Sequence, residues 1–285
     1  MAKIWDCFTF YNELDILEIR LSELDRVVDK FVLVEAEHTF RGNPKPLLFA
    51  ENRHRFARWQ DKIVHVVVRD MPLAAPSAWT RETHQRDCIM RGIGEAAAED
   101  IVLVSDVDEI PRAKILERSL RDIDFKHSIA CFCLDHFQHY LNWHVSGGLL
   151  GTRAVRRGYL KHPDGTRHAK LRSKPSPVIR AVANVKWTLG SIIDYGRPLR
   201  RVAVENAGWH FSFMGDAEFA RNKIGSYSHA ENDIAEVVGH GVVEERLRNR
   251  ITVLGSKARI VGLDALPDAV AADPARFAAL LDRDV

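Results

Sequence analysis

The sequence runs Ile101-Val-Leu-Val-Ser-Asp106-Val107-Asp108-Glu109-Ile110-Pro111 at a point where a short apolar segment gives way to carboxylates. Residues 101–104 are apolar and rich in β-branched side chains, which is typical of a strand covered on both faces, as in a parallel sheet. Asp106 and Asp108 are two residues apart, so an extended chain projects both side chains to one side. Hard oxygen ligands suit Mg²⁺ or Mn²⁺, and such a cation can also hold a diphosphate. The pattern therefore indicates a divalent-cation site at the end of a buried strand.

An ordinary alternative is that these acids only face water or cap a helix, since Asp-x-Asp also occurs by chance. Three acidic residues, Asp106, Asp108 and Glu109, lie within four positions here. Their mutual repulsion is costly unless a cation or solvent relieves it. The crowding therefore favours the cation site.

The composition excludes several classes of protein. A chain of 285 residues can bury a substantial core, as one large α/β domain or two small ones. Lys and Arg number 41 against 39 Asp and Glu, a net charge of +2, which provides no global basic field for nucleic acid. No stretch approaches the roughly 20 apolar residues of a membrane-spanning helix, and the amino terminus shows no secretion signal. We therefore expect a soluble, cytoplasmic protein that does not bind nucleic acid.

Two local patterns each allow more than one interpretation. The segment 153–172 holds seven Lys and Arg residues against one acid, Asp164, so it either faces an anionic substrate or forms a solvated loop. The chain also has four cysteines, Cys7, Cys88, Cys131 and Cys133. They lack paired zinc-type spacing, so we expect reduced, buried thiols.

Strands and helices alternate along the first 110 residues. The patterns predict strands at 3–10, 30–36, 63–69 and 101–105, and helices at 12–25, 47–59 and 81–98. Asn12 is the predicted cap of the first helix. Because strands separated by helices imply right-handed crossovers, we predict an α/β fold with a central, mainly parallel sheet flanked by helices.

In such sheets, ligands gather outside the carboxyl ends of the strands. The polar residues predicted to meet at this edge and to bind a cofactor are Asn12, Glu35, Asp70 and Asp106. The amino-terminal part of the 81–98 helix lies on the same edge and carries Arg86. This guanidinium either meets a diphosphate beside the metal or pairs within the helix with Glu82. Both roles for Arg86 stay open at this level.

Seven segments stand in a fixed order along the chain. They are Phe8-Thr-Phe-Tyr-Asn-Glu-Leu-Asp-Ile-Leu-Glu-Ile-Arg-Leu21, Phe31-Val-Leu-Val-Glu-Ala36, Thr39-Phe-Arg-Gly-Asn-Pro-Lys-Pro-Leu47, Glu82-Thr-His-Gln-Arg-Asp87, Val104-Ser-Asp-Val-Asp-Glu-Ile-Pro-Arg112, Gly208-Trp-His-Phe-Ser-Phe213 and Leu266-Pro267. This ordered set, which covers about residues 5–280, resembles glycosyltransferase family 17. The resemblance implies a GT-A type nucleotide-sugar-binding fold, a UDP-sugar donor, and Mn²⁺ or Mg²⁺ held at Asp106 and Asp108.

The resemblance also implies an activity. A member of this family is expected to be a metal-dependent inverting glycosyltransferase that moves a sugar, N-acetylglucosamine, from a UDP-sugar to a hydroxyl of a glycan or glycolipid. Golgi members of the family have an amino-terminal membrane anchor, whereas this chain starts directly at its first predicted strand. We therefore expect a cytoplasmic enzyme with a lipid-linked or polysaccharide acceptor and at most peripheral membrane contact.

The second half of the chain is predicted to complete one domain over 1–285, with 1–112 on the donor side and 113–285 on the acceptor side. A strand at 128–134 precedes an aromatic and His-rich segment at 135–144, whose rings either stack on sugar faces or pack at a sheet edge. Asp135 follows that strand and is the candidate catalytic base for the acceptor hydroxyl. His210 lies between large apolar residues and is either structural or a further metal ligand. Further helices are predicted at 216–231 and 233–252, and an Ala-rich terminal segment at 264–281 is expected to pack on the sheet.

Two rival functions come from other classes. A phosphatase of the haloacid dehalogenase type also uses Asp-x-Asp after a strand, but there the pair follows the first strand and precedes Thr or Val. Here the pair follows the fourth predicted strand, and Glu109 and Ile110 come next. The other rival is a non-catalytic protein that binds a nucleotide or carbohydrate. Release of free UDP from a UDP-sugar would rule out this rival.

Overall fold

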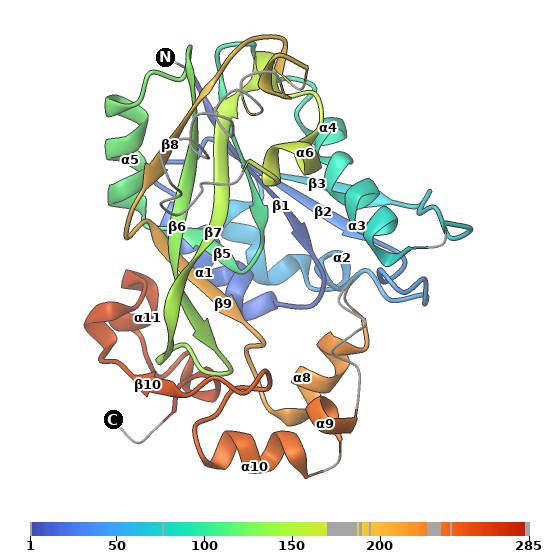
Figure 1. Ribbon diagram of the computed structural model, residues 1–285, viewed down its shortest axis with the longest axis vertical. Coiled ribbons are helices and arrows are strands. Elements are labelled where there is room, and N and C mark those ends of the chain that lie inside the picture. Colours follow the sequence, from blue (N-terminus) through green and yellow to red (C-terminus); the bar gives the residue numbers. More distant parts are fainter. Residues whose placement is uncertain are drawn as a thin grey trace, which may run out of the picture.

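The computed structural model describes residues 2–75, 77–169, 187, 190–193, 195–226, 235–239 and 241–282. Within these residues the strands are β1 (Ile4–Phe10), β2 (Lys30–Ala36), β3 (Ile63–Val68), β4 (Ile101–Asp106), β5 (Glu109–Pro111), β6 (Ser128–Gln138), β7 (Trp143–Arg156), β8 (Arg200–Val204), β9 (Gly208–Ser212) and β10 (Ala258–Ile260). They join into one 10-stranded sheet with helices on both sides (Figure 1). The strand order is β3-β2-β1-β4-β7-β6-β9-β5, with β10 beside β7 and β8 beside β6.

The amino-terminal half of the sheet is parallel, as predicted. β1 pairs in parallel with β2 and β4, and β2 pairs in parallel with β3. Every residue of β1 is buried, which explains why its sequence is an almost unbroken apolar run. Beyond β4 the sheet is mixed, because β7 runs antiparallel to both β4 and β6.

Helices cover both faces of the parallel half. The α-helices are α1 (Leu14–Leu24), α2 (Leu48–Glu51), α3 (Ala78–Asp87), α4 (Ile89–Gly92), α5 (Ala113–Asp122), α6 (Pro163–Arg167), α8 (Ala217–Ile224), α9 (Ala235–Val238), α10 (Val242–Arg248) and α11 (Asp268–Ala272), and the 3-10 turns are η1 (Arg53–Trp59), η2 (Arg157–Tyr159), η4 (Leu263–Ala265) and η5 (Ala278–Leu280). Apolar side chains of α1, α2, η1 and α5 share one core cluster with Phe8 and Leu33, and α4 packs with Cys7 and Val34 on the opposite face. No helix among the described residues is long and apolar enough to span a bilayer.

Several helix boundaries differ from the sequence prediction. The prediction of Asn12 as a cap is wrong, because Glu13 takes the N-cap position of α1 and its carboxylate accepts the backbone N–H groups of Tyr11 and Asn12. The predicted helix at 47–59 divides into α2 and η1. The helix predicted at 81–98 begins earlier, at Ala78, because the Ser77 hydroxyl accepts the Trp79 N–H at 3.2 Å, and its continuation α4 ends at Gly92.

The long antiparallel pair of β6 and β7 is the main feature that the sequence did not predict. β6 continues to Gln138, beyond the predicted strand at 128–134, and β7 covers residues 143–156. Glycines obscure the strand pattern of β7, yet Gly151 is favoured there. A Cβ at this position would lie 2.1 Å from Leu134 Cδ1 on the paired strand. A larger residue would therefore displace the Leu134 side chain, so the packing here favours glycine.

The carboxyl-terminal segments pack beside α1 and β9. Val270 and Phe277 share a core cluster with Ile16 and Trp209, so the predicted Ala-rich segment packs on the domain in short turns instead of one helix. α8 and α10 form a separate small cluster. The ends of the predicted helices at 216–231 and 233–252 lie partly outside the described residues.

We expect a buried histidine, His139, to make the folded protein less stable at mildly acidic pH. His139 is fully buried, its Nε2 accepts the Val253 N–H at 3.0 Å, and burial lowers its pKa from 6.5 to about 4. Between these pH values the unfolded chain binds a proton at this position and the folded chain does not. The free energy of unfolding is therefore highest, as far as His139 is concerned, above about pH 6.5. It decreases as the pH falls, by up to about 3 kcal/mol near pH 4.

Urea unfolding at a series of pH values measures this loss. His136, whose pKa is also lowered to about 4, contributes in the same direction. His139→Gln should therefore flatten the pH dependence without abolishing it. An unchanged slope in the variant would contradict the role given to His139.

Candidate active site

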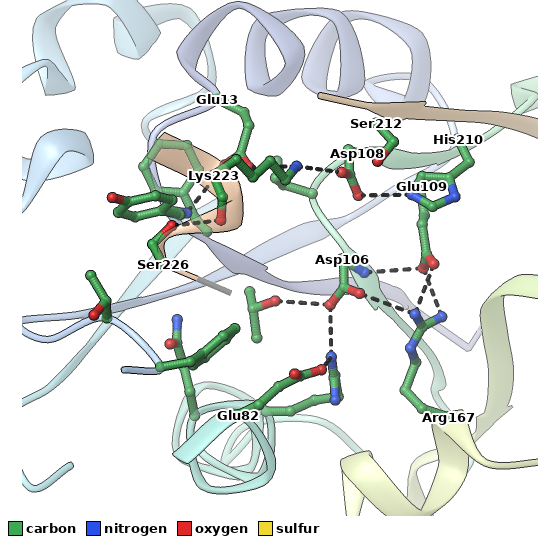
Figure 2. Close-up of a pocket in the computed structure, with 18 of the residues that line it drawn as sticks. Glu13, Glu82, Asp106, Asp108, Glu109, Arg167, His210, Ser212, Lys223 and Ser226 are labelled. Carbon is green, nitrogen blue, oxygen red and sulfur yellow. Dashed lines mark hydrogen bonds and ion pairs between the residues drawn. The ribbon is translucent and has the colours of Figure 1, made fainter. Parts of the chain in front are cut away.

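A cavity of about 720 Å³ opens at the carboxyl edge of the parallel strands. It is lined by the ends of β1 and β4, by α3 and α6, and by α8 from the carboxyl-terminal half. Asp106 and Asp108 both face it (Figure 2). The prediction that this edge carries the pocket is thus supported by the cavity itself, whose volume lies in the usual range of about 300–1,000 Å³ for small-molecule sites.

Asp106 is held in a clamp of two guanidinium groups. Arg167 donates to its carboxylate at 3.0 Å (Figure 2). Arg86 also donates to it at 3.0 Å, and the Thr9 hydroxyl donates at 2.9 Å. Although burial raises the pKa of Asp106, the two arginines outweigh it and hold this pKa well below its usual range. The carboxylate is therefore ionised and fixed in direction throughout the physiological pH range.

Arg86 makes the pair within the helix that the sequence allowed, and its predicted contact with a diphosphate stays a prediction. It pairs with Glu82 at 2.7 Å within α3, and it also reaches Asp106 and Asp164. Burial lowers the pKa of Arg86, but the surrounding carboxylates raise it by more, so the net shift is upward and the group stays charged. The helix thus presents a fixed positive charge beside Asp106.

The basic segment at 153–172 is partly a wall of this pocket. Arg167 binds both carboxylate oxygens of Glu109 at 2.7 Å in addition to Asp106, and Arg153 also lines the cavity. Lys161 is exposed, as expected for a solvated loop. Lys170 and Arg172 lie outside the described residues. Part of this segment therefore lines the cavity and part is solvated, and its contact with an anionic substrate stays a prediction.

A third cation comes from far along the chain. Lys223 on α8 lies 3.0 Å from Asp108 and 3.2 Å from Glu13 (Figure 2). Burial lowers the pKa of Lys223, whereas Asp108 and Glu13 raise it more strongly, so the net shift is upward and the amine stays protonated. Asp106 and Asp108 therefore lie in separate surroundings, the first with arginines and the second with a lysine.

Asp108 and His210 fit a divalent cation. The Asp108 Oδ1 atom lies 3.6 Å from His210 Nε2, a separation that one ion with ligand distances of about 2.1 Å can bridge. His210 stacks on His136 with ring centroids 5.3 Å apart, so its ring is held in place. The predicted pairing of Asp108 with His210 at one site is therefore consistent with the geometry.

Asp106 is less suited to the same ion. The donor atoms of Asp106, Asp108 and His210 do not form a group within 4.8 Å, although a different trio among the described residues does. The carboxylate of Asp106 already accepts two guanidinium groups and a hydroxyl. Direct binding of the metal by Asp106 therefore finds no support, whereas its place beside the cavity suits a position next to the donor.

The turn that carries these acids rests on a buried arginine. Arg20 of α1 is fully buried and forms a two-point pair with Asp6, with distances of 2.8 and 2.6 Å. The same guanidinium donates to the backbone carbonyls of Asp106 and Glu109 at 3.1 and 2.7 Å. Arg20 thus fixes the backbone on both sides of Asp108 from beneath.

Two residues predicted to bind the donor, Glu35 and Asn12, do not line the cavity. Glu35 is fully buried, and its carboxylate accepts the Phe49 N–H at 2.9 Å and contacts His65 at 3.0 Å. Asn12 is next to the pocket residue Glu13 but does not line the cavity. The cofactor role predicted for these two residues finds no support in their positions.

Asp70 and Asp135 also lie away from the cavity. Asp70 is exposed and forms a two-point ion pair with Arg91 at 2.9 and 2.7 Å. Asp135 pairs in register with Trp209 and binds Arg112 at 3.2 Å, while the next residue, His136, pairs with His210. Because neighbouring strand residues point to opposite faces, Asp135 faces away from the pocket that His210 lines. The position of Asp135 therefore gives no support to its predicted role as catalytic base.

Sequence reasoning missed the pocket roles of Lys223, Glu13 and Glu109. Glu13 and Glu109 stood at predicted strand ends, so the edge rule that selected Asn12 could also have selected them. Lys223 gave no local signal, because it meets Asp108 across 115 positions of sequence.

The fold and the site together define a class of protein. A parallel half-sheet carries an Asp-x-Asp turn at its carboxyl edge, beside a cavity lined by fixed cations, and a mixed half-sheet completes the other wall. This is the predicted α/β fold, with a central sheet whose first half is parallel and which is flanked by helices (Figure 1).

The chain belongs to glycosyltransferase family 17, whose profile matches residues 1–163. It is 25% identical to the β-1,4-mannosyl-glycoprotein 4-β-N-acetylglucosaminyltransferase of Rattus norvegicus over 236 residues, and 26% identical to that of Homo sapiens. These alignments cover 74% of this chain and 40% of each relative, so the chain spans less than half the length of these proteins.

Solved structures resemble the chain more distantly. Glucosyl-3-phosphoglycerate synthase of Mycobacterium tuberculosis is 13% identical, with a TM-score of 0.34, over 69% of this chain and 82% of the other. A 4-diphosphocytidyl-2C-methyl-D-erythritol synthase from Anaerococcus prevotii is 9% identical, also with a TM-score of 0.34, over 72% and 89% of the two chains.

Proposed function

We propose that this chain is a metal-dependent inverting glycosyltransferase that moves N-acetylglucosamine from a UDP-sugar to a hydroxyl of a glycan or lipid-linked acceptor. The sugar and a glycan acceptor follow from the names of the family relatives, and the lipid-linked alternative is our own expectation from the sequence. The observation that carries the proposal is the Asp106–Asp108 turn, which lies among Arg86, Arg167 and Lys223 in one cavity. Three fixed cations around two carboxylates are suited to a ligand that carries both a metal and a diphosphate.

Arg86 and Arg167 are the proposed positive wall of the diphosphate site. Both are largely buried and held by carboxylates, so neither reorganises when a phosphate arrives. Preorganised charges of this kind stabilise the negative charge that develops on a leaving nucleoside diphosphate. Asp106 orients both guanidinium groups and, in this proposal, contacts the donor beside them.

Asp108 and His210 are the residues that would hold the cation. When bound, a divalent ion would offset the charge of the departing diphosphate as a Lewis acid. Lys223 now neutralises Asp108, so its amine must leave that carboxylate as a cation arrives. Glu13 keeps the amine in the pocket, at 3.2 Å, where it remains available to the phosphate oxygens.

The surroundings of the pocket carboxylates favour transfer of the sugar in one inverting step, without a covalent intermediate on the protein. Asp106 and Glu109 are bound to Arg167, and Asp108 and Glu13 are bound to Lys223. Carboxylates held in this way are poor nucleophiles toward an anomeric carbon. In the proposed reaction the acceptor hydroxyl attacks the anomeric carbon directly and inverts its configuration, and a pocket acid on the Lys223 side takes the hydroxyl proton.

The cytoplasmic location of the protein stays a prediction.

The phosphatase alternative fits the pocket less well. A phosphatase of this type needs an aspartate that is accessible as a nucleophile, whereas the first acid of the turn, Asp106, is occupied by three donors. The turn also follows β4, the fourth strand in the sequence. The other alternative, a protein that binds the nucleotide sugar without catalysis, is excluded only if turnover of the nucleotide sugar is measured.

A panel of nucleotide sugars tests the proposal. The full chain is assayed for thermal stabilisation by UDP-, GDP- and CMP-sugars with Mn²⁺ or with chelator, and then for release of free nucleotide. We expect UDP-N-acetylglucosamine with Mn²⁺ to raise the melting temperature most, because a ligand that binds only the folded state stabilises it. We also expect slow release of UDP. Stabilisation without any release would favour a binding protein, and phosphate release from a phosphomonoester would favour the phosphatase.

A further inference from the structure

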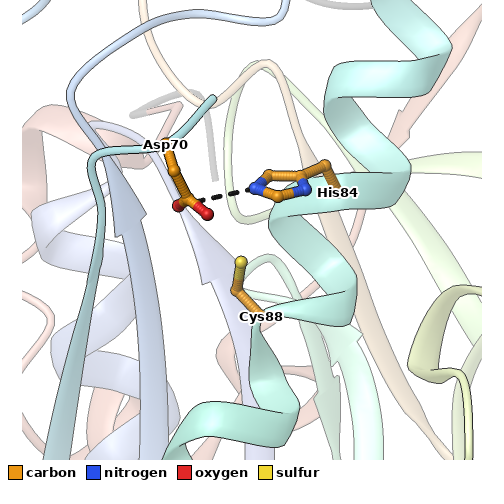
Figure 3. Close-up of side chains that lie close together, drawn as sticks. All are labelled: Asp70, His84 and Cys88. Atoms are coloured by element: carbon orange, nitrogen blue, oxygen red, sulfur yellow. Dashed lines mark ion pairs between the residues drawn. The ribbon is translucent and has the colours of Figure 1, made fainter. Parts of the chain in front are cut away.

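A second cluster of metal-type ligands lies outside the pocket, between the end of β3 and α3 (Figure 3). Asp70, His84 and Cys88 each place one potential ligand atom within 4.8 Å of those of the other two. His84 and Cys88 are four residues apart, so they project from one side of the helix. Asp70 comes from the segment that follows β3 and faces them (Figure 3).

The spacing of these atoms suits a small tetrahedral ion. Zinc binds histidine nitrogen and carboxylate oxygen at about 2.0–2.2 Å and thiolate sulfur at about 2.3 Å, so two such ligands lie about 3.3–3.6 Å apart. The Asp70 Oδ1 atom is 3.5 Å from His84 Nε2. Small side-chain rotations would bring the sulfur into the same range.

His84 has an unsatisfied atom at the centre of this cluster. Its Nε2 is buried and has no hydrogen-bond partner among the described residues. Such atoms are uncommon in folded proteins and need a physical explanation. The atom points toward Asp70, with which it makes only the 3.5 Å contact (Figure 3). A metal ion at this place would satisfy it.

Asp70 is held in place by a second partner. Both oxygens of its carboxylate accept hydrogen bonds from Arg91, at 2.9 and 2.7 Å. Outer partners of this kind commonly orient a ligating carboxylate, and each oxygen retains a lone pair for a metal. The Asp70 side chain is 57% exposed, which leaves the site open to ions from solvent.

We propose that Asp70, His84 and Cys88 bind one transition-metal ion of the Zn²⁺ class, with water as the fourth ligand. The donors are one oxygen, one nitrogen and one sulfur, a set that favours Zn²⁺ over Mg²⁺ or Mn²⁺. As the Cys88 sulfur binds, its thiol proton passes to solvent. The ion would tie α3 to the end of β3, and α3 also carries Arg86 into the pocket.

Titration with Co²⁺ tests this site by its colour. A thiolate bound to Co²⁺ gives a charge-transfer absorption band that oxygen and nitrogen ligands do not give. The pocket residues around Asp108 include no cysteine, so the band reports on Cys88 even if Co²⁺ also enters the pocket. With metal-free chain we expect the band to rise to a plateau as Co²⁺ is added and to disappear when Zn²⁺ is added.

Matched variants decide the outcome. Cys88→Ser should remove the band, and Cys133→Ser, which changes a half-buried thiol elsewhere, should keep it. His84→Gln should weaken the affinity for Co²⁺ at least about tenfold, whereas His127→Gln, at an exposed histidine paired with Asp124, should not. Because Cys88 is buried and its variant is at risk of misfolding, the half-exposed His84 supplies an independent test. Absence of the band from the wild type, or its persistence in Cys88→Ser, would overturn the proposal.

Discussion

Asp108→Asn should lower glycosyl transfer by at least about a hundredfold while it leaves the fold intact. Asp108 faces the cavity, contacts His210 at 3.6 Å and is the acid that Lys223 now neutralises. The amide keeps the shape of the side chain but removes its charge, so a divalent cation loses its principal anionic ligand. The measurement is UDP release and sugar transfer across a Mn²⁺ titration, with the unfolding midpoint measured in parallel.

The control for this variant is Asp135→Asn. Asp135 also pairs with a basic residue, Arg112, but it lies on the face of the sheet away from the cavity. We expect near wild-type turnover and unchanged donor affinity from this control. Equal losses in the two variants would show that the site does not centre on Asp108, and a loss confined to Asp135→Asn would restore Asp135 as the base.

Arg20→Met should destabilise the protein by about 3–5 kcal/mol, the cost of leaving a buried charge without its partner. Arg20 and Asp6 are both fully buried, and the arginine supplies both hydrogen bonds of their two-point pair. The same substitution removes the donor to the carbonyls of Asp106 and Glu109. Urea unfolding measures the loss, and donor affinity should fall as the turn loses its support.

A double variant separates the two effects of this change. Asp6→Leu combined with Arg20→Met removes the unpaired carboxylate, so we expect it to recover part of the stability but not the donor affinity. If Arg20→Met changes the free energy of unfolding by less than about 1 kcal/mol, the typical effect of a point substitution, then Arg20 does not support the turn as described.

The parallel half of the fold was predictable because its signals are local. β1, β2, β3 and β4 are short apolar runs, and the helices between them have caps or apolar stripes within a few residues. The Asp-x-Asp turn could be placed for the same reason. β7 was missed because its glycines resemble a loop, although Gly147 has a positive φ and Gly151 packs against Leu134.

The remaining parts of the site depend on contacts that no local pattern encodes. Arg167 meets Asp106 across 61 positions, and Lys223 meets Asp108 across 115. The position of Asp135 has a similar origin, because the register of β6 against β9 places it opposite Trp209 and places His136 opposite His210. Composition identified the basic segment around Arg167 but could not separate its pocket residues from its exposed ones.

Calorimetry of UDP binding tests the central claim most directly, because it needs neither the acceptor nor the correct sugar. The wild type and Asp108→Asn are each titrated with UDP in Mn²⁺ and in chelator. If Asp108 anchors a cation that holds the diphosphate, Mn²⁺ should tighten UDP binding at least about tenfold, or 1.4 kcal/mol, in the wild type and have little effect in the variant. Equal affinity in all four titrations, or no binding of UDP by the wild type, would contradict the account.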